Sequence, residues 1–140
     1  MTIAQQPFGA FLESLAAKTP TPGGGAVTAA VGALSAALAG MVVSYSLGKK
    51  NLMEHQGELE QAAARLAKAR QLMLALVEED ERAYAAVNEL SRLPEGEARR
   101  TAELPSAASA ATQAPLAVMA AACDLLRHLE RLASITNKHL

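Results

Sequence analysis

Three consecutive glycines, Gly23, Gly24 and Gly25, follow the prolines Pro20 and Pro22 and precede a long uncharged stretch. Backbone amides without side chains, placed just before a helix, can converge on an anion, which the helix dipole also favours. They also let a flat ligand touch the backbone directly. The segment lacks the Lys-Ser/Thr pair of a P-loop, and no predicted strand precedes it as in a dinucleotide fingerprint. Because the prolines stiffen the chain, we expect a shaped binding loop, with a flexible turn as the alternative.

Asp80 is a second candidate, because it interrupts an apolar stripe. A buried carboxylate is costly unless it is paired or hydrogen-bonded, and its pKa moves readily, which suits acid–base chemistry. The alternative is a helix that curves away from the core and leaves Asp80 in water. The stripe recurs every seven residues, at Leu52, Leu59, Leu66, Met73, Asp80 and Val87, and again three positions later at His55, Ala62, Ala69, Leu76, Ala83 and Leu90.

Lys49 and Lys50 form a third candidate, directly after Gly48. They could bind anionic groups, or they could serve only as favourable charges at the C-terminal end of a helix capped by Gly48. His55 is expected to be a residue at the edge of the stripe rather than a ligand. On a straight helix His55 and Asp80 would lie about 37 Å apart, so they cannot share one site within a subunit.

The elements that must position these residues are helices. Aromatic residues make up 3% of the 140 residues and there is no Trp, while alanine and other good helix formers dominate. Strict alternation is rare, so we predict an all-α single domain over residues 1–140. Prolines and glycines divide the chain into about five helices, expected near 8–17, 26–47, 52–93, 97–113 and 115–134. Pro105 interrupts the fourth of these. The fifth carries Leu116, Met119, Cys123 and Leu126 along one face.

The segment from Ala26 to Leu47 has 22 residues and no charge. Small residues recur at every fourth position, which lets another helix approach closely. We expect this helix to be buried between subunits, because a helix that is apolar nearly all round is a central or an interface helix. A membrane span is the alternative, disfavoured because alanine, serine, threonine and glycine dominate. The small residues are Thr28, Gly32, Ala36, Gly40 and Ser44.

Composition excludes several other functions. A net charge of −1 and few clustered basic residues give no field for nucleic acid. The N-terminus lacks the basic start and apolar run of a signal peptide. The single cysteine, Cys123, cannot form an internal disulfide and fits a reducing, cytoplasmic location. We expect it to be a small core residue, since no Cys/His spacing predicts a zinc site.

Several separated segments together resemble the cyclodeaminase/cyclohydrolase family. The segment "FLESLAAKTPTPGGGAVTAAVGALSAALAGMVVSYSLGKK", Phe11–Lys50, is similar to the start of that family, with P-T-P-G-G-G and G-K-K as its most specific marks. The segment "LVEEDERAYAAV" at Leu76–Val87 is similar to the family's E-D-x-x-A-[FY] segment and places Asp80 on its acidic position. "LP-G" at Leu93–Gly96 and "ATQAPL" at Ala111–Leu116 follow in the same order.

The resemblance implies a dimeric all-helical domain that binds a tetrahydrofolate derivative near the glycine loop and the subunit interface. It implies either ammonia-releasing cyclisation of 5-formiminotetrahydrofolate or hydrolysis of 5,10-methenyltetrahydrofolate, with no metal and no redox cofactor. On this chain, Asp80 and Lys49 would be catalytic. Pro22, the three glycines Gly23–Gly25 and Lys50 would contact the substrate.

One departure matters. Family members usually continue after a segment like "ITNKHL" with a serine-aspartate pair and further helices, which this chain lacks. The alternative function is therefore a non-catalytic helical oligomer or ligand-binding relative that keeps the fold. Pro105 is a second, smaller departure from the family's pattern.

Overall fold

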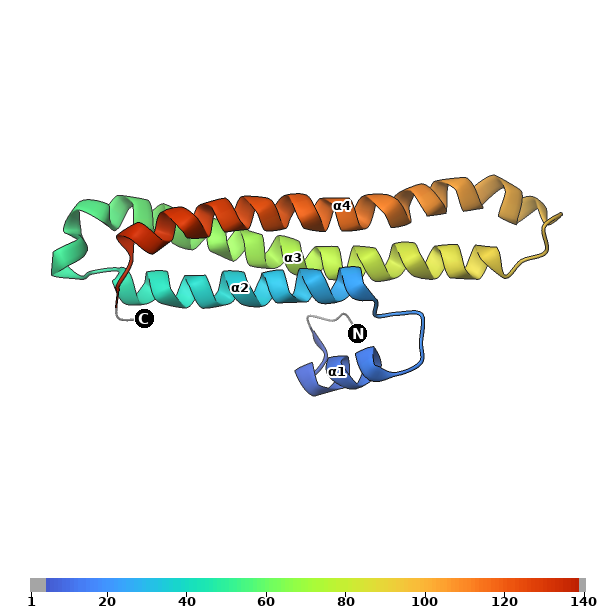
Figure 1. Cartoon of the computed structure of the whole chain (residues 1–140), viewed down its shortest axis with the longest axis horizontal. Helices are drawn as coiled ribbons and strands as arrows, with labels where there is room; N and C mark the ends of the chain where they lie inside the picture. The colour runs from blue at the N-terminus through green and yellow to red at the C-terminus, as the bar shows by residue number, and fades with distance from the viewer. Residues whose placement is uncertain (1–4, 139–140) are drawn as a thin grey trace.

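The computed structural model describes residues 5–138, and these residues form helices with no strand. The elements are α1 (Phe8–Ala16), α2 (Gly24–Ser46), a 3-10 segment η2 (Lys50–His55), α3 (Gln56–Ser91) and α4 (Ala98–Ile135). Helices α2, α3 and α4 run up, down and up in one long bundle, while α1 lies beside the N-terminal half of α2 (Figure 1). The prediction of an all-α fold is confirmed.

The core lies along α3, which packs against both α2 and α4. Its buried residues are Leu59, Ala62, Leu66, Met73, Val77, Ala83 and Leu90. Six of these seven belong to the predicted stripe, so the heptad pattern identified the face of α3 that turns inward. Asp80 interrupts the pattern and is not among the buried residues of α3. Val77, about one turn earlier, is buried instead.

Helix α2 approaches its neighbours through small residues. Its buried positions are Ala26, Ala29, Ala33, Ala36, Val43 and Ser46. At Gly32 a Cβ atom would lie 2.8 Å from the sulfur of Met73 on α3, so glycine there permits the close approach of the two helices. Part of the small-residue row therefore packs within the chain, and burial of α2 between subunits stays a prediction.

The expected break between a fourth and a fifth helix is wrong. Helix α4 is continuous from Ala98 to Ile135 and contains both Pro105 and Pro115. Each proline removes one backbone hydrogen bond to the residue four positions earlier. Both proline side chains are exposed, so their rings do not disturb the core, and packing of the rest of α4 on α3 keeps the helix intact.

The prediction that Cys123 is a core residue is also wrong, because Cys123 is exposed. Helix α4 carries two neighbouring apolar stripes, and only one of them can face α3. The buried stripe is Ala114, Val118, Leu125 and Leu132, whereas the expected apolar face of Leu116, Met119, Cys123 and Leu126 lies on the surface.

Two helices, α2 and α4, are long and apolar enough to cross a membrane by length and composition alone. Their most apolar windows are 28% and 17% buried in the bundle. Core helices pass the same test, and α2 packs against α3 along its length.

Candidate functional site

The glycine segment and Asp80 meet at the start of α2. Gly23 is extended and precedes the first helical residue, Gly24. The backbone N–H of Ala26 donates a hydrogen bond of 2.9 Å to Oδ2 of Asp80, which lies 54 residues later on α3. The carboxylate also lies so close to the Cα of Gly25 that any Cβ there would overlap it. Glycine at position 25 is therefore a condition of this contact.

In this contact, a side chain of the protein itself occupies part of the N-terminus of α2. A carboxylate that accepts from a first-turn amide is stabilised both by the hydrogen bond and by the helix dipole. Part of the anion-binding capacity predicted for the glycine loop is thus used by the protein's own Asp80. Gly23 and Gly24 remain open, because a Cβ at either position would meet nothing within 4 Å.

A cavity of about 390 Å³ lies over this contact. Within residues 5–138, Asp80 is the only charged residue that lines it, and the backbone of the three glycines forms part of its wall. Pro22, which follows a cis peptide bond, is not among the lining residues. The full lining is Pro20, Thr21, Gly23, Gly24, Gly25, Asp80, Tyr84, Ala111 and Pro115.

Tyr84 is a lining residue that the sequence reasoning did not single out. It follows Asp80 by four positions on α3, and residues at that spacing share a face of a helix. It also occupies the aromatic position of the segment "EDERAY". The spacing from Asp80 and the aromatic position in this segment are together sufficient to predict Tyr84 as a site residue. Its side chain is 48% exposed, which leaves the ring accessible to a ligand.

Lys49 and Lys50 lie at the opposite end of α2. Helix α2 ends at Ser46 with Leu47 as its C-cap, so the predicted cap at Gly48 lies one residue too late. Gly48, with a φ of 74°, forms the following turn, and its N–H donates a 2.7 Å hydrogen bond to Oε1 of Gln56. Both lysines are exposed, and neither forms an ion pair within residues 5–138. About 36 Å of helix separates them from Gly25. Within one chain the structure therefore brings the glycines to Asp80 but not the lysines.

Glu81 is a half-buried carboxyl next to Asp80. Burial raises the pKa of Glu81, and repulsion from Asp80 and then from Glu78 raises it further. The site end of α3 is therefore a place where ionising a second carboxylate is unfavourable.

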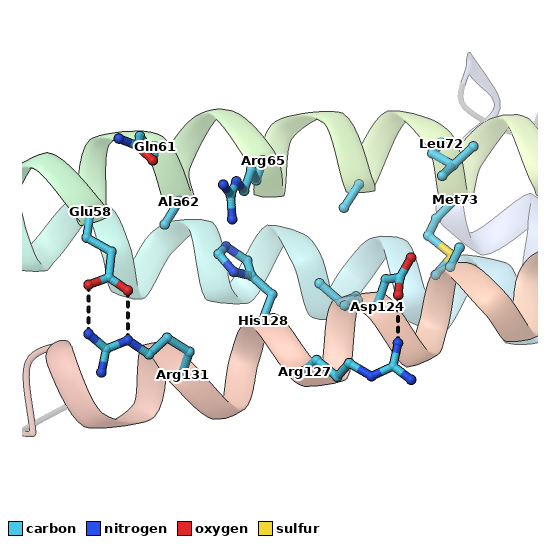
Figure 2. Close-up of a pocket in the computed structure, with 13 residues that line it drawn as sticks. Glu58, Gln61, Ala62, Arg65, Leu72, Met73, Asp124, Arg127, His128 and Arg131 are labelled. Carbon is cyan, nitrogen blue, oxygen red and sulfur yellow. Dashed lines mark hydrogen bonds and ion pairs between the residues drawn. The ribbon is translucent and has the colours of Figure 1, made fainter.

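A larger cavity of about 540 Å³ lies between α3 and α4 (Figure 2). Arg131 spans it at one end through two hydrogen bonds to Glu58, of 2.7 and 2.8 Å, which lower the pKa of the Glu58 carboxyl. Nε2 of His128 is buried there without a hydrogen-bond partner in the described part of the chain. None of the catalytic or substrate-binding residues predicted from the sequence lines this cavity within residues 5–138. Across residues 5–138 no group of three or more His, Cys, Asp or Glu side chains is arranged to hold a metal ion.

The chain is similar to known proteins along nearly its whole length. The family model described as formiminotransferase-cyclodeaminase matches residues 7–140. A methenyltetrahydrofolate cyclohydrolase from Methylorubrum extorquens is 36% identical over 129 residues, which cover 89% of this chain and 60% of that protein. A formimidoyltransferase-cyclodeaminase from Rattus norvegicus is 33% identical over 132 residues, covering 91% of this chain and 24% of that protein.

The fold is also similar to a solved structure. The crystal structure of a formiminotetrahydrofolate cyclodeaminase from Thermotoga maritima matches with a TM-score of 0.87 and 32% identity. The match covers 98% of this chain and 66% of the other. The chain thus spans 60% of the cyclohydrolase relative and about a quarter of the animal enzymes. These matches confirm the resemblance found in the sequence: the chain belongs to the formiminotransferase-cyclodeaminase family.

Proposed function

We propose that this chain is an enzyme that acts on the one-carbon unit carried by N5 and N10 of a tetrahydrofolate. The observation that carries the proposal is the contact of Asp80 with Gly25 and Ala26 beneath a cavity of about 390 Å³. Relatives named as a methenyltetrahydrofolate cyclohydrolase and as formimidoyltransferase-cyclodeaminases support it.

We assign the proton transfer to Asp80. Its Oδ2 is fixed by the Ala26 amide, so the carboxylate has a defined orientation at the cavity wall. In hydrolysis, water adds to the methenyl carbon and gives one proton to Asp80. The bond from that carbon to N5 then breaks as N5 takes this proton from Asp80, and the hydroxyl that becomes the formyl oxygen releases its proton to solvent. In cyclisation, N10 attacks the formimino carbon and loses its proton, and the protonated nitrogen leaves as ammonia. Both routes need one acid–base group at the tetrahedral carbon.

The rest of the cavity suits a flat ring. The glycine segment offers backbone without side chains, and Tyr84 offers an aromatic surface on the same cavity. A pterin could pack against both, because aromatic side chains favour stacked contacts with ring systems. We place this chemistry in the cytoplasm, where an exposed thiol such as Cys123 stays reduced, and we assign it no metal or redox cofactor.

The test is the absorbance of 5,10-methenyltetrahydrofolate, followed with each substrate separately. We expect turnover with one of the two, and a loss of kcat by about 100-fold or more in Asp80→Asn. Asparagine keeps an oxygen to accept from the Ala26 amide, so the fold should be retained. Glu79→Gln, at a neighbouring exposed position, is the matched control and should keep wild-type turnover.

Two results would decide against parts of this proposal. Full turnover by Asp80→Asn would remove Asp80 from the mechanism. A folded wild-type chain that turns over neither substrate would favour the non-catalytic, ligand-binding alternative. Circular dichroism of each variant shows whether a loss reflects chemistry or unfolding.

A further inference from the structure

The cavity between α3 and α4 is separate from the candidate site at Asp80. Arg65, which lines this cavity, lies fifteen positions before Asp80 on α3, or about 22 Å along the helix axis. The volume of about 540 Å³ is in the range of pockets that bind small molecules. The reaction proposed above uses none of the lining residues, so the cavity is open to a second ligand.

The acidic residues of this cavity are paired with arginines. Both carboxylate oxygens of Glu58 on α3 accept hydrogen bonds from Arg131 on α4, at 2.7 and 2.8 Å. These bonds lower the pKa of Glu58, so it stays ionised at neutral pH. On α4, Asp124 accepts a hydrogen bond of 2.9 Å from Arg127. The protein therefore neutralises both of these carboxylates itself.

Arg65 differs from the other two arginines. Within residues 5–138 it forms no ion pair. In this part of the chain, three arginines and two carboxylates line the cavity, which leaves one positive charge uncompensated. The guanidinium of Arg65 points from α3 toward the imidazole of His128 on α4 (Figure 2). Arginine stays charged at any pH at which the protein is folded, so this positive charge is permanent.

His128 is the polar group opposite Arg65. Its Nε2 is buried without a hydrogen-bond partner in the described part of the chain, and an unpaired buried nitrogen lowers stability. Arginine has five N–H donors and no acceptor, so Arg65 cannot accept a hydrogen bond from Nε2. An anionic oxygen between the two side chains would accept from both. It would pair the nitrogen of His128 and neutralise Arg65 at the same time.

The wall beyond these two groups is mostly apolar. Leu72 and Met73 lie toward the end of the cavity away from the ion pair that joins the two helices (Figure 2). Met73 and Leu125 are buried, whereas Leu72 is 51% exposed and has apolar surface that a ligand could cover. Burial of such surface favours a ligand with an apolar body. Alanines leave the space between these larger side chains: Ala62, Ala69 and Ala121.

We propose that the α3–α4 cavity binds a small monocarboxylate with an apolar body. Its carboxylate lies between Arg65 and His128, and its body packs against Met73 and Leu125. One carboxylate balances the single uncompensated charge, whereas a phosphate dianion would place excess negative charge near Glu58. The planar guanidinium also matches a carboxylate through two parallel hydrogen bonds. The site does not depend on the proposed folate chemistry.

Thermal melts test the class of ligand. The probes are benzoate, its uncharged analogue benzamide, and inorganic phosphate, all at neutral pH and at one ionic strength set with sodium chloride. Tm should rise with benzoate concentration, because a ligand that binds only the folded state stabilises it. Benzamide and phosphate should leave Tm unchanged. An equal rise with benzamide would overturn recognition of a carboxylate, and a larger rise with phosphate would overturn the choice of a monoanion.

Titration calorimetry with benzoate locates the site. Arg65→Gln removes the unpaired guanidinium and should raise Kd at least about tenfold. Lys68→Gln removes an exposed cation on the same helix that does not line this cavity, and it should keep the wild-type Kd. Equal weakening in both variants would overturn the site. Asp80→Asn should also keep the wild-type Kd, and loss of binding in that variant would place benzoate at the Asp80 cavity instead.

His128→Leu tests the unpaired nitrogen. Leucine has no polar atom to bury, so without ligand this variant should melt at least as high as the wild type. Benzoate should raise its Tm less than it raises that of the wild type, and an equal rise would remove His128 from the site. Should the variant fail to fold, the ¹⁵N resonance of Nε2 in wild-type His128 decides the same point. It should shift with benzoate and not with benzamide, and no shift with benzoate would overturn the contact.

Discussion

At the scale of single residues, the contact with Asp80 leaves less room at Gly25 than at any other glycine of the chain. Gly25→Ala would force the carboxylate and the start of α2 apart, because its Cβ overlaps the Asp80 side chain. Overpacking of this kind costs about 1–3 kcal/mol. We expect a lower free energy of unfolding in urea, together with lower turnover.

Gly24→Ala is the control for this change. It adds the same methyl group one residue earlier, where nothing lies within 4 Å, and alanine favours a helix more than glycine does. Its free energy of unfolding should equal or exceed that of the wild type. Equal losses in both variants would show that the Asp80 contact is not what position 25 requires.

Glu81 gives a prediction for pH dependence. Burial and the neighbouring carboxylates raise the pKa of Glu81, so its ionised form is less favourable in the folded state than in the unfolded one. Above the ordinary pKa of a glutamate, ionised Glu81 therefore lowers stability. Glu81→Gln should raise Tm at pH 7 by about 1–2 °C, and the gain should vanish below about pH 4. Thermal melts across this range measure it, and a gain that is constant with pH would contradict the electrostatic cause.

At the scale of elements, α4 shows that a long helix can contain a proline at a price in stability. Pro105 removes one backbone hydrogen bond from the helix interior, and its rigid ring recovers part of this loss by restricting the unfolded chain. Pro105→Ala should raise the free energy of unfolding by about 1–2 kcal/mol. Pro94→Ala, in the connection between α3 and α4, should not. Denaturant titrations compare the two, and a destabilised Pro105→Ala would show that the helix needs a kink there.

Helices α3 and α4 differ in how well the sequence predicts their buried faces. The heptad pattern identified the buried face of α3, because six of the seven buried residues of α3 belong to one continuous apolar stripe. It could not choose between the two apolar stripes of α4, since both have helical spacing and only packing distinguishes them. Cys123 lies on the stripe that packing leaves at the surface.

The candidate site was predictable to a similar degree. The glycines and Asp80 could be singled out by residue type and by the resemblance to the family. Their direct contact could not be, because it depends on the register of α2 against α3. The separation of Lys50 from Asp80 within one chain follows from the length of the helix between them.

At the scale of the whole molecule, the exposed stripe on α2, formed by Val31, Leu34, Leu38, Met41 and Tyr45, gives a test of the predicted pairing of two copies. If two copies pair along it, the folded state gains from binding and Tm must depend on protein concentration. We expect Tm of the wild-type chain to rise by several degrees between micromolar and hundred-micromolar concentrations. Leu38→Glu should melt at a temperature independent of concentration. A wild-type Tm that does not change with concentration would contradict pairing in this range.

The hydrogen bond from Ala26 to Asp80 has a mechanical consequence. It ties the first turn of α2 to α3 at one height, so a slide of either helix by a single residue, about 1.5 Å, breaks it. The shape of the cavity and the register of α2 against α3 can therefore change only together. A ligand that binds at Asp80 and fixes this contact must also restrict movement of α2 along its axis. Slower exchange of backbone amide hydrogens along α2, far from the cavity, would then detect the binding of that ligand.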